Sequence, residues 1–291
     1  MTNQLVSEKV ITIEPSRNLL SFNKFDEINH QIINQNLELL ISMLKLIIPI
    51  ELLDDGKTKF EIRRNHLNYS MRVNTLNELL ENILLRSFLE AKNCCYLEIN
   101  GLIYLNDVYK DILSLEYYPL SFRQSDDSIR EYMINWFQKT VPRIPIKWNT
   151  LIFFGGECTL LGKILSGYSK QQYFYTDYPS IYSDIKRNYK NPNVEMINYK
   201  TWKISRNGFI NDSANLDCCC IVNTGFQGMG ENLAREICKI YAAEIYVISC
   251  NQESWAKDLS VLSESYNLLE QIEIRTNYSI WIYKLSNRVL P

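Results

Sequence analysis

The sequence predicts an α/β protein in which a small α+β domain precedes a larger domain with a mainly parallel sheet. From about residue 116 onward, apolar strand-like segments alternate with amphipathic helical segments, which is typical of a parallel sheet covered on both faces. Several of these strands, such as TLIFF and CCCIV, are continuous apolar runs, as expected for strands buried on both sides. The earlier residues follow a ββαββ order. We therefore expect two domains, residues 1–115 and 116–291.

The small domain is expected to place one helix on an antiparallel sheet. Residues 17–48 predict a helix that ends near Pro49, because proline interrupts helical hydrogen bonding. Thr75 and Glu78 have the spacing of a capping box at the start of an amphipathic helix. The other elements are strands at 57–65, 67–74, 94–100 and 101–107, and the helix at 75–92.

The large domain begins with a helix at 125–139, whose first turn is acidic, as the helix dipole favours. Alternating units follow and two extended segments close the chain. The expected strands are 150–154, 172–177, 194–198, 217–223, 244–249, 269–274 and 279–285, and the expected helices are 155–165, 178–191, 231–241 and 253–265. Ligands bind at the carboxyl ends of the strands in such sheets.

The charge distribution gives no basic signature, since the 291-residue chain has a formal net charge of −2. A nucleic acid would therefore be held by a local patch. The candidate RNA-facing patch lies on the first two strands of the small domain. Adjacent strand residues point to opposite faces, so Arg63 and Arg64 cannot both contribute to one surface, and a solvated polar face is the alternative interpretation. The candidate residues are Lys59, Arg63, Arg64 and Arg72.

The most apolar segment, residues 37–53, contains Glu38, Lys45 and Pro49, which a membrane span tolerates poorly. Its helical spacing favours an amphipathic core helix. The N-terminus lacks the basic region and apolar core of a signal peptide. We expect no membrane association and an intracellular, cytoplasmic protein.

The eight cysteines form no CxxC pair, and the chain has only two histidines. We therefore expect no metal site, and a Ser–His–Asp triad is disfavoured. The consecutive Cys218, Cys219 and Cys220 are expected to be small buried apolar residues.

Polar or small residues mark several strand ends in the large domain. Gly155 and Gly156 follow one strand, Asp177 ends the next, and Asn223 ends a third. Glycines let a ligand approach the backbone closely, and a carboxylate there can accept the ribose hydroxyls of a nucleotide-like cofactor. A tight turn and a helix cap are the alternative interpretations for the glycines and for Asp177. Cys250 follows the next strand and precedes a helix, whose N-terminus would favour the thiolate.

These segments resemble the S-adenosylmethionine-dependent RNA (uracil-5-)methyltransferases, a family with a Rossmann-like fold. The matching segments follow the family's order over residues 117–287, with YVISCNQESWAKDL the most specific and the glycine turn the least. The small ββαββ domain resembles the RNA-facing domain of the same enzymes more loosely. The segments are SFRQSDDSIREYMINWF, LIFFGGECTLLGKIL, FYTD with NPNVEMI, and YVISCNQESWAKDL.

The resemblance implies S-adenosylmethionine as cofactor and a tRNA-like RNA as partner. It makes Gln124, Gly156 and Asp177 contacts to the cofactor, with Gly155 in the same turn. Cys250 becomes the nucleophile that adds to C6 of uracil so that C5 can accept a methyl group. Asn251 would support the catalytic base or its loop.

The sequence also departs from the family's pattern. The family's Asp-Pro-Pro-Arg is replaced by Asn223-Thr224-Gly225-Phe226, and Gln252 replaces the proline after Ser-Cys-Asn. The His-x-Glu loop, whose glutamate is the base, has no counterpart; Glu253 and Glu273 are possible substitutes without support from spacing. A catalytically inactive homologue that binds RNA or a protein partner as a scaffold is therefore the alternative function.

Overall fold

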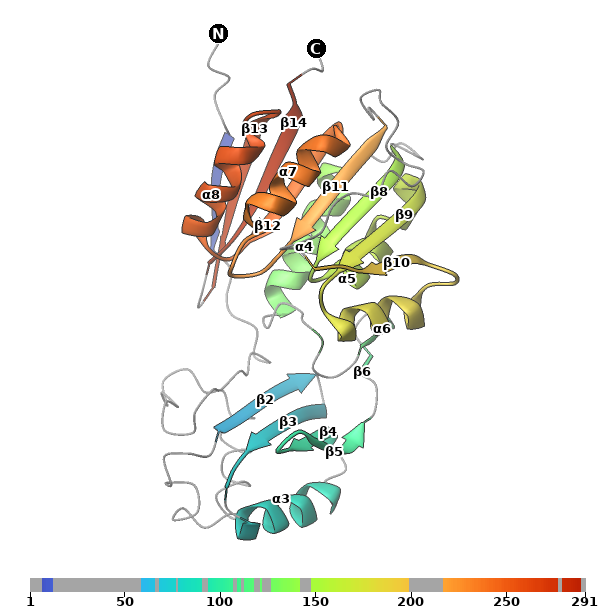
Figure 1. The fold of residues 1–291 in the computed structure, drawn as a ribbon, viewed down its shortest axis with the longest axis vertical. Coiled ribbons are helices and arrows are strands. Elements are labelled where there is room, and N and C mark those ends of the chain that lie inside the picture. Colours follow the sequence, from blue (N-terminus) through green and yellow to red (C-terminus); the bar gives the residue numbers. More distant parts are fainter. Residues whose placement is uncertain are drawn as a thin grey trace. The chain divides into compact units, whose positions relative to one another are not determined.

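A computed structural model describes the chain over residues 7–12, 59–65, 68–76, 78–90, 94–106, 109–110, 113–117, 121, 127–141, 148–198, 217–276 and 279–288. The chain divides into two compact units (Figure 1). The large unit comprises residues 1–15, 122–124 and 128–291, and the small unit comprises residues 16–121 and 125–127. The expected helix at 17–48 lies outside the described residues.

The large unit is built on an eight-stranded sheet in the order β1-β13-β14-β12-β11-β8-β9-β10. Every pair is parallel except the two that β14 makes with β12 and β13. The mainly parallel sheet predicted from the sequence is confirmed. Its strands are β1 (Ser7–Thr12), β8 (Trp148–Gly155), β9 (Ser169–Thr176), β10 (Asn193–Met196), β11 (Cys218–Asn223), β12 (Glu244–Ser249), β13 (Tyr266–Arg275) and β14 (Ser279–Asn287).

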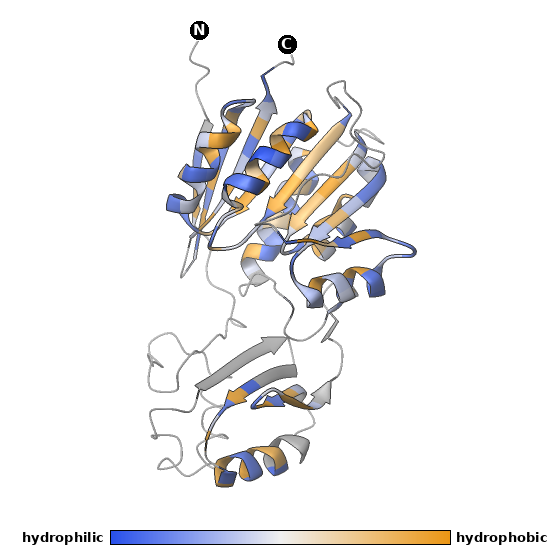
Figure 2. Cartoon of the chain, in the orientation of Figure 1, coloured by the Kyte–Doolittle hydropathy of each residue, from blue (hydrophilic) through white to orange (hydrophobic). Residues whose placement is uncertain are grey.

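Helices cover both faces of this sheet and bury two separate apolar layers. One layer contains Phe137, Leu161 and Ile185 from α4, α5 and α6, and the other contains Ile237 and Trp255 from α7 and α8. The strands between them are the most apolar part of the unit (Figure 2). The helices are α4 (Asp127–Thr140), α5 (Cys158–Ile164), α6 (Pro179–Asn188), α7 (Gly230–Ile240) and α8 (Gln252–Leu262), with a short 3-10 helix η2 (Ser166–Tyr168).

The three consecutive cysteines follow the alternation of β11. Cys219 faces the layer with α4, α5 and α6, whereas Cys218 and Cys220 face the layer with α7 and α8. All three are fully buried. The prediction that they are small core residues is confirmed.

The small unit has the expected ββαββ order, but its sheet is not purely antiparallel. β3 pairs with β4 in parallel, while β2–β3 and β4–β5 are antiparallel. The expectation of an antiparallel sheet was wrong because α3 connects β3 to β4, and such a crossover returns the chain in the same direction. The elements are β2 (Lys59–Asn65), β3 (Asn68–Asn74), α3 (Glu78–Glu90), β4 (Cys94–Ile99), β5 (Leu102–Asn106) and the β6–β7 pair (Tyr109–Lys110 and Glu116–Tyr117).

β1 differs from the expected domain division. Its residues 7–12 pair in parallel with β13, from Ser7 opposite Glu270 to Thr12 opposite Arg275. They therefore belong to the large sheet, although the sequence interpretation placed all of residues 1–115 in the small domain. A short strand that pairs with residues more than 250 positions away leaves no local pattern.

Among the described residues, no helix is long and apolar enough to cross a membrane.

Candidate functional site

The candidate site lies at the carboxyl ends of the parallel strands, where the direction of winding reverses. From β8 the chain continues outward to β9 and β10, and it then returns to β11 on the other side of β8. Sheets of this kind bind ligands outside the carboxyl ends of strands at such a switch point. Gly155 and Asn223 are the last residues of β8 and β11 and lie opposite each other.

Gly155 is required by its neighbour on β11. A Cβ built on Gly155 would lie 2.0 Å from the Asn223 carbonyl oxygen, and the residue has φ of +86°. The Gly156 N–H also donates to that carbonyl. Contact between two strands therefore explains Gly155, which supports the tight-turn interpretation of this glycine.

The turn after Gly156 is closed by a buried ion pair. Glu157 adopts the left-handed conformation, with φ of 51°, and its Oε1 lies 3.2 Å from Nε of Arg130 on α4. Both side chains are at most 5% exposed. The next residue, Cys158, is buried, and its thiol donates to the Gly155 carbonyl at 2.9 Å. Burial also raises the pKa of this thiol well above its usual value.

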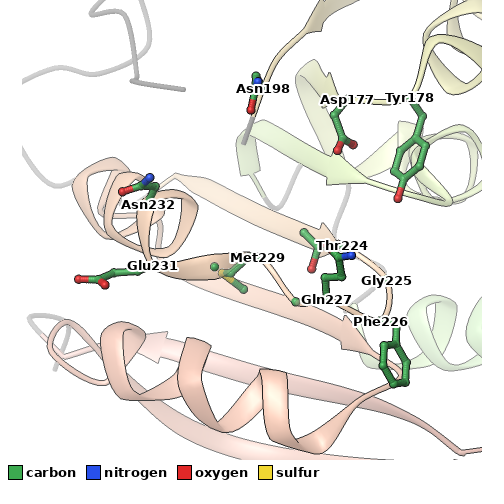
Figure 3. Close-up of a pocket in the computed structure, with 12 residues that line it drawn as sticks. Asp177, Tyr178, Asn198, Thr224, Gly225, Phe226, Gln227, Met229, Glu231 and Asn232 are labelled. Atoms are coloured by element: carbon green, nitrogen blue, oxygen red, sulfur yellow. The ribbon is translucent and has the colours of Figure 1, made fainter. Parts of the chain in front are cut away.

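A cavity of about 750 Å³ opens at this rim (Figure 3). Asp177 and Tyr178 line it from the end of β9, and Asn198 lines it beyond β10. The opposite side is the loop from Thr224 to Met229 and the first turn of α7, which contributes Glu231 and Asn232. Its size is in the usual range for small-molecule sites.

Asp177 is the only candidate cofactor contact from the sequence analysis that lines this cavity among the described residues. Partial burial raises the pKa of its carboxyl group, and a backbone hydrogen bond partly offsets that effect. Burial raises the pKa of the adjacent Tyr178 phenol, and the negative charges that Asp177 and Cys250 carry when deprotonated raise it further. Tyr178 therefore lies within electrostatic reach of both the carboxylate and the thiol.

Cys250 lies at the carboxyl end of β12, on the same rim as Asp177. Two strands separate β12 from β9, so three strand spacings of about 4.8 Å place the two strand ends about 14 Å apart. The thiol is half-buried and packs against the core layer that contains Tyr246 and Ile248. Cys250 is not among the residues that line the 750 Å³ cavity.

The Cys250 thiol is not activated by its surroundings. Burial raises its pKa above the usual value, and a backbone hydrogen bond lowers it by less. The helix α8 does begin two residues later, as the sequence predicts. Desolvation disfavours a charged sulfur and so opposes the stabilisation expected from this helix.

Asn251 joins two parts of the rim through hydrogen bonds. Its Oδ1 accepts from the Glu253 N–H at 2.9 Å and so caps α8, which is the usual role of an asparagine in this position. Its Nδ2 donates to the Phe226 carbonyl at 3.2 Å. Ser254 Oγ donates to the same carbonyl, also at 3.2 Å. Asn251 therefore fixes the loop that borders the cavity.

A buried carboxylate holds the far end of the same loop. The two oxygens of Asp258, on α8, accept hydrogen bonds from the backbone N–H groups of Met229 and Gly230 at 2.9 and 3.0 Å. Burial raises the pKa of Asp258, although these two hydrogen bonds lower it. The sequence match that includes Asp258 and Leu259 gave no indication of this role, because its partners lie 28 and 29 residues earlier.

Asn223 is buried at the end of β11, and its Nδ2 has no hydrogen-bond acceptor among the described residues. A buried donor without a partner is costly. Asn223 lies opposite Gly155 on one side and Ile248 on the other. Its side chain does not line the cavity.

The two carboxylates considered as replacement bases differ in their surroundings. Glu273 on β13 accepts two hydrogen bonds from Arg275, at 2.7 and 2.9 Å, and one from Ser279 at 2.8 Å. The hydrogen bond from Arg275 lowers the pKa of Glu273, so this carboxylate is a poor proton acceptor. Glu253 lies in the first turn of α8, beside Phe226 and Asn251 in a second cavity of about 690 Å³.

The basic candidates of the small unit are only partly described. Arg72 on β3 lies 3.0 Å from the carboxylate of Glu98 on β4, so its charge is at least partly neutralised. Lys59, Arg63 and Arg64 lie on β2, whose side chains are outside the described residues, and Gln124 is outside them altogether. In the described part of the chain, no cluster of His, Cys, Asp or Glu could hold a metal ion.

The chain was compared with known proteins by sequence and by structure. No protein family and no curated protein matches it by sequence. A solved tRNA (uracil-54, C5)-methyltransferase from Pyrococcus abyssi, in complex with S-adenosyl-L-homocysteine, is similar in structure with a TM-score of 0.62. The two sequences are 15% identical, and the likeness covers 95% of this chain and 78% of that chain. This likeness shows a shared fold.

Two further solved structures are more distant. A putative transferase from Pyrococcus horikoshii has a TM-score of 0.48 at 12% identity, covering 86% of this chain and 98% of that one. The N-methyltransferase NodS from Bradyrhizobium japonicum has a TM-score of 0.42 at 10% identity, covering 56% and 87%. The likeness to the tRNA methyltransferase structure confirms the Rossmann-like fold that the sequence resemblance implied.

The described residues fit the nucleoside part of S-adenosylmethionine. Asp177 places a carboxylate at the cavity, a group that can accept two ribose hydroxyls, and Asn198 places an amide on the same side. The contacts at the glycine turn are made by protein groups, namely the Asn223 carbonyl and the Arg130–Glu157 ion pair. The sequence analysis missed Asn198, although a polar residue at the end of a third parallel strand was a usable signal.

Proposed function

We propose that this chain is an S-adenosylmethionine-binding RNA methyltransferase that acts on C5 of uridine in a tRNA-like RNA. The observation that carries the proposal is the placement of Asp177 and Asn198 on a cavity at the switch point of a methyltransferase fold. In the solved tRNA methyltransferase that the chain resembles, the ligand is S-adenosyl-L-homocysteine. When bound, the cofactor supplies an electrophilic methyl group.

In this proposal, the chain's own residues position the uracil and open a route to its C5. The Cys250 thiol loses its proton, and its sulfur forms a bond to C6, which places electron density on C5. Once C5 carries the methyl group, a base removes the C5 proton. The C5–C6 double bond then re-forms, and the bond from sulfur to C6 breaks to release the Cys250 thiolate. Glu253 is the carboxylate at the rim that we assign to this last proton, since Glu273 is held by Arg275.

The experiment uses RNA containing 5-fluorouridine, because fluorine at C5 cannot be removed as a proton and the adduct persists. The wild-type chain, incubated with this RNA and S-adenosylmethionine, is expected to give a slower band on a denaturing gel. Cys250→Ala should give none, while Cys238→Ala, at a half-buried thiol outside the rim, should behave like the wild type. A wild-type chain that binds the cofactor yet forms no adduct would refute the proposed covalent chemistry.

A second function, RNA binding without methyl transfer, is favoured by one observation. The Cys250 thiol is held neutral by burial and lies outside the cavity that contains Asp177. A chain of this kind would retain cofactor and RNA binding as a scaffold or subunit. This second function is supported if the chain binds both the cofactor and RNA but forms no adduct in the 5-fluorouridine experiment.

A further inference from the structure

Phe226 is an exposed aromatic side chain on a backbone that is held in place. It is 70% exposed, more than any other large apolar residue of the large unit among the described residues. It borders both the 750 Å³ cavity and the second cavity between α7 and α8. Figure 3 shows its ring at the edge of the loop, with Tyr178 across the opening.

The loop around Phe226 is fixed on both sides. The Phe226 carbonyl accepts the hydrogen bonds from Asn251 and Ser254, and Asp258 holds the N–H groups of Met229 and Gly230. Asn251 directly follows Cys250, so the same contacts place the Phe226 backbone beside the strand end that carries the thiol.

The surroundings of the ring favour a flat, single ligand over a protein surface. Its neighbours along the chain are Gly225, Gln227 and Gly228, so it is not part of a contiguous apolar patch of the kind that proteins dock on. A Cβ built on Gly225 would meet nothing within 4 Å beyond its chain neighbours, which leaves space beside the ring.

We propose that Phe226 is the stacking surface for an unpaired nucleobase of the RNA, which it holds at the rim between Cys250 and the cavity. Unstacked bases are commonly bound on aromatic side chains. The formal net charge of −2 gives RNA no general attraction, so base contacts and local basic residues have to supply the affinity. This inference rests on the proposed function, because it specifies how the RNA is recognised.

The test compares binding of two fluorescent oligomers by anisotropy. One is oligouridylate of about ten nucleotides, within the usual site size for single strands, and the other is an abasic strand of equal length and charge. Phe226→Ala should weaken oligouridylate binding about 5- to 100-fold, as expected for one base stacked on an aromatic ring. Binding of the abasic strand should not change, and Phe226→Trp should retain affinity for oligouridylate.

Tyr241→Asn is the matched control. Tyr241 is also an exposed aromatic residue, 47% exposed, at the opposite end of α7, and asparagine tolerates its left-handed conformation. This variant should bind oligouridylate like the wild type. Equal oligouridylate affinities for the wild type and Phe226→Ala would overturn the inference, as would a loss of self-association in Phe226→Ala with RNA binding unchanged.

Calorimetric titration of S-adenosylmethionine separates this failure from that of the proposed function. A wild-type chain that binds the cofactor but not oligouridylate overturns the stacking inference alone. Binding of neither ligand overturns both proposals.

Discussion

Cys250 is half-buried at a strand end, and its surroundings determine how reactive its sulfur is. Because burial raises the pKa of the thiol, the thiolate is a minor form at neutral pH, and its fraction rises about tenfold per pH unit below the pKa. The apo chain is therefore a slow nucleophile. For the proposed chemistry to proceed, bound RNA would have to lower the pKa of the Cys250 thiol or exclude water from the sulfur.

We expect alkylation of Cys250 by iodoacetamide to be slow at pH 7 and to accelerate continuously up to pH 9, without a plateau. The physical reason is the raised pKa, since only the thiolate reacts. Mass spectrometry of the modified peptide measures the rate at this position. A rate that already levels off near pH 7 would show an activated thiolate and contradict this description of the site.

Asn251 shows what sequence reasoning at the residue scale could and could not provide. Its position after Cys250 and before a helix was readable, and so was its ability to cap. Its hydrogen bond to the Phe226 carbonyl joins residues 25 positions apart, which no local pattern encodes. A strand end also does not specify the direction of its last side chain, so the sequence could not show which way the Cys250 thiol points.

At the element scale, the close approach of β8 and β11 depends on the absence of a side chain at Gly155. Gly155→Ala should lower the free energy of unfolding by about 2–5 kcal/mol. The added Cβ would lie 2.0 Å from the Asn223 carbonyl oxygen, and alanine would have to adopt a positive φ. Gly225→Ala is the matched control, with φ of +74° in open space, and should cost about 1–2 kcal/mol. Urea denaturation measures both. Equal losses would mean that conformation alone, and not the close approach of β11, requires Gly155.

The connection between α7 and α8 depends on Asp258. In Asp258→Asn, the amide nitrogen would face one of the two backbone N–H donors of Met229 and Gly230. Leaving that donor without an acceptor should cost about 1–3 kcal/mol, measurable as a lower midpoint in urea. Asp217→Asn, at the amino end of β11 and bonded to the Asn149 side chain, serves as an exposed control. No destabilisation beyond that control would show that the Asp258 contacts contribute little.

The elements themselves were largely predictable, because apolar periodicity and turn residues act within a few positions of the chain. The strand expected at 217–223 is Cys218–Asn223, and the helix expected at 253–265 is Gln252–Leu262, so the bounds agree within three residues. The parallel β3–β4 pair was not, since the expected strands were assigned without their partners. Pairing depends on which edges meet in space, and the crossover through α3 decides it.

At the scale of the whole molecule, the two apolar layers on the eight-stranded sheet of the large unit bring residues from distant positions to one rim. The fold class followed from the alternation of strands and helices. The strand order did not, and β1 in particular joins the large sheet through β13 alone. The cavity depends on this order, because β9, β10 and the loop after β11 meet only at the switch point.

The most direct measurement for the central claim is a calorimetric titration of the full chain with S-adenosylmethionine. The account predicts saturable binding that Asp177→Ala weakens about 10- to 100-fold through the loss of charge-assisted hydrogen bonds. Glu195→Ala, at a neighbouring exposed carboxylate on β10, should bind like the wild type. No heat at millimolar ligand, or equal affinity in Asp177→Ala, would contradict a cofactor site at this rim.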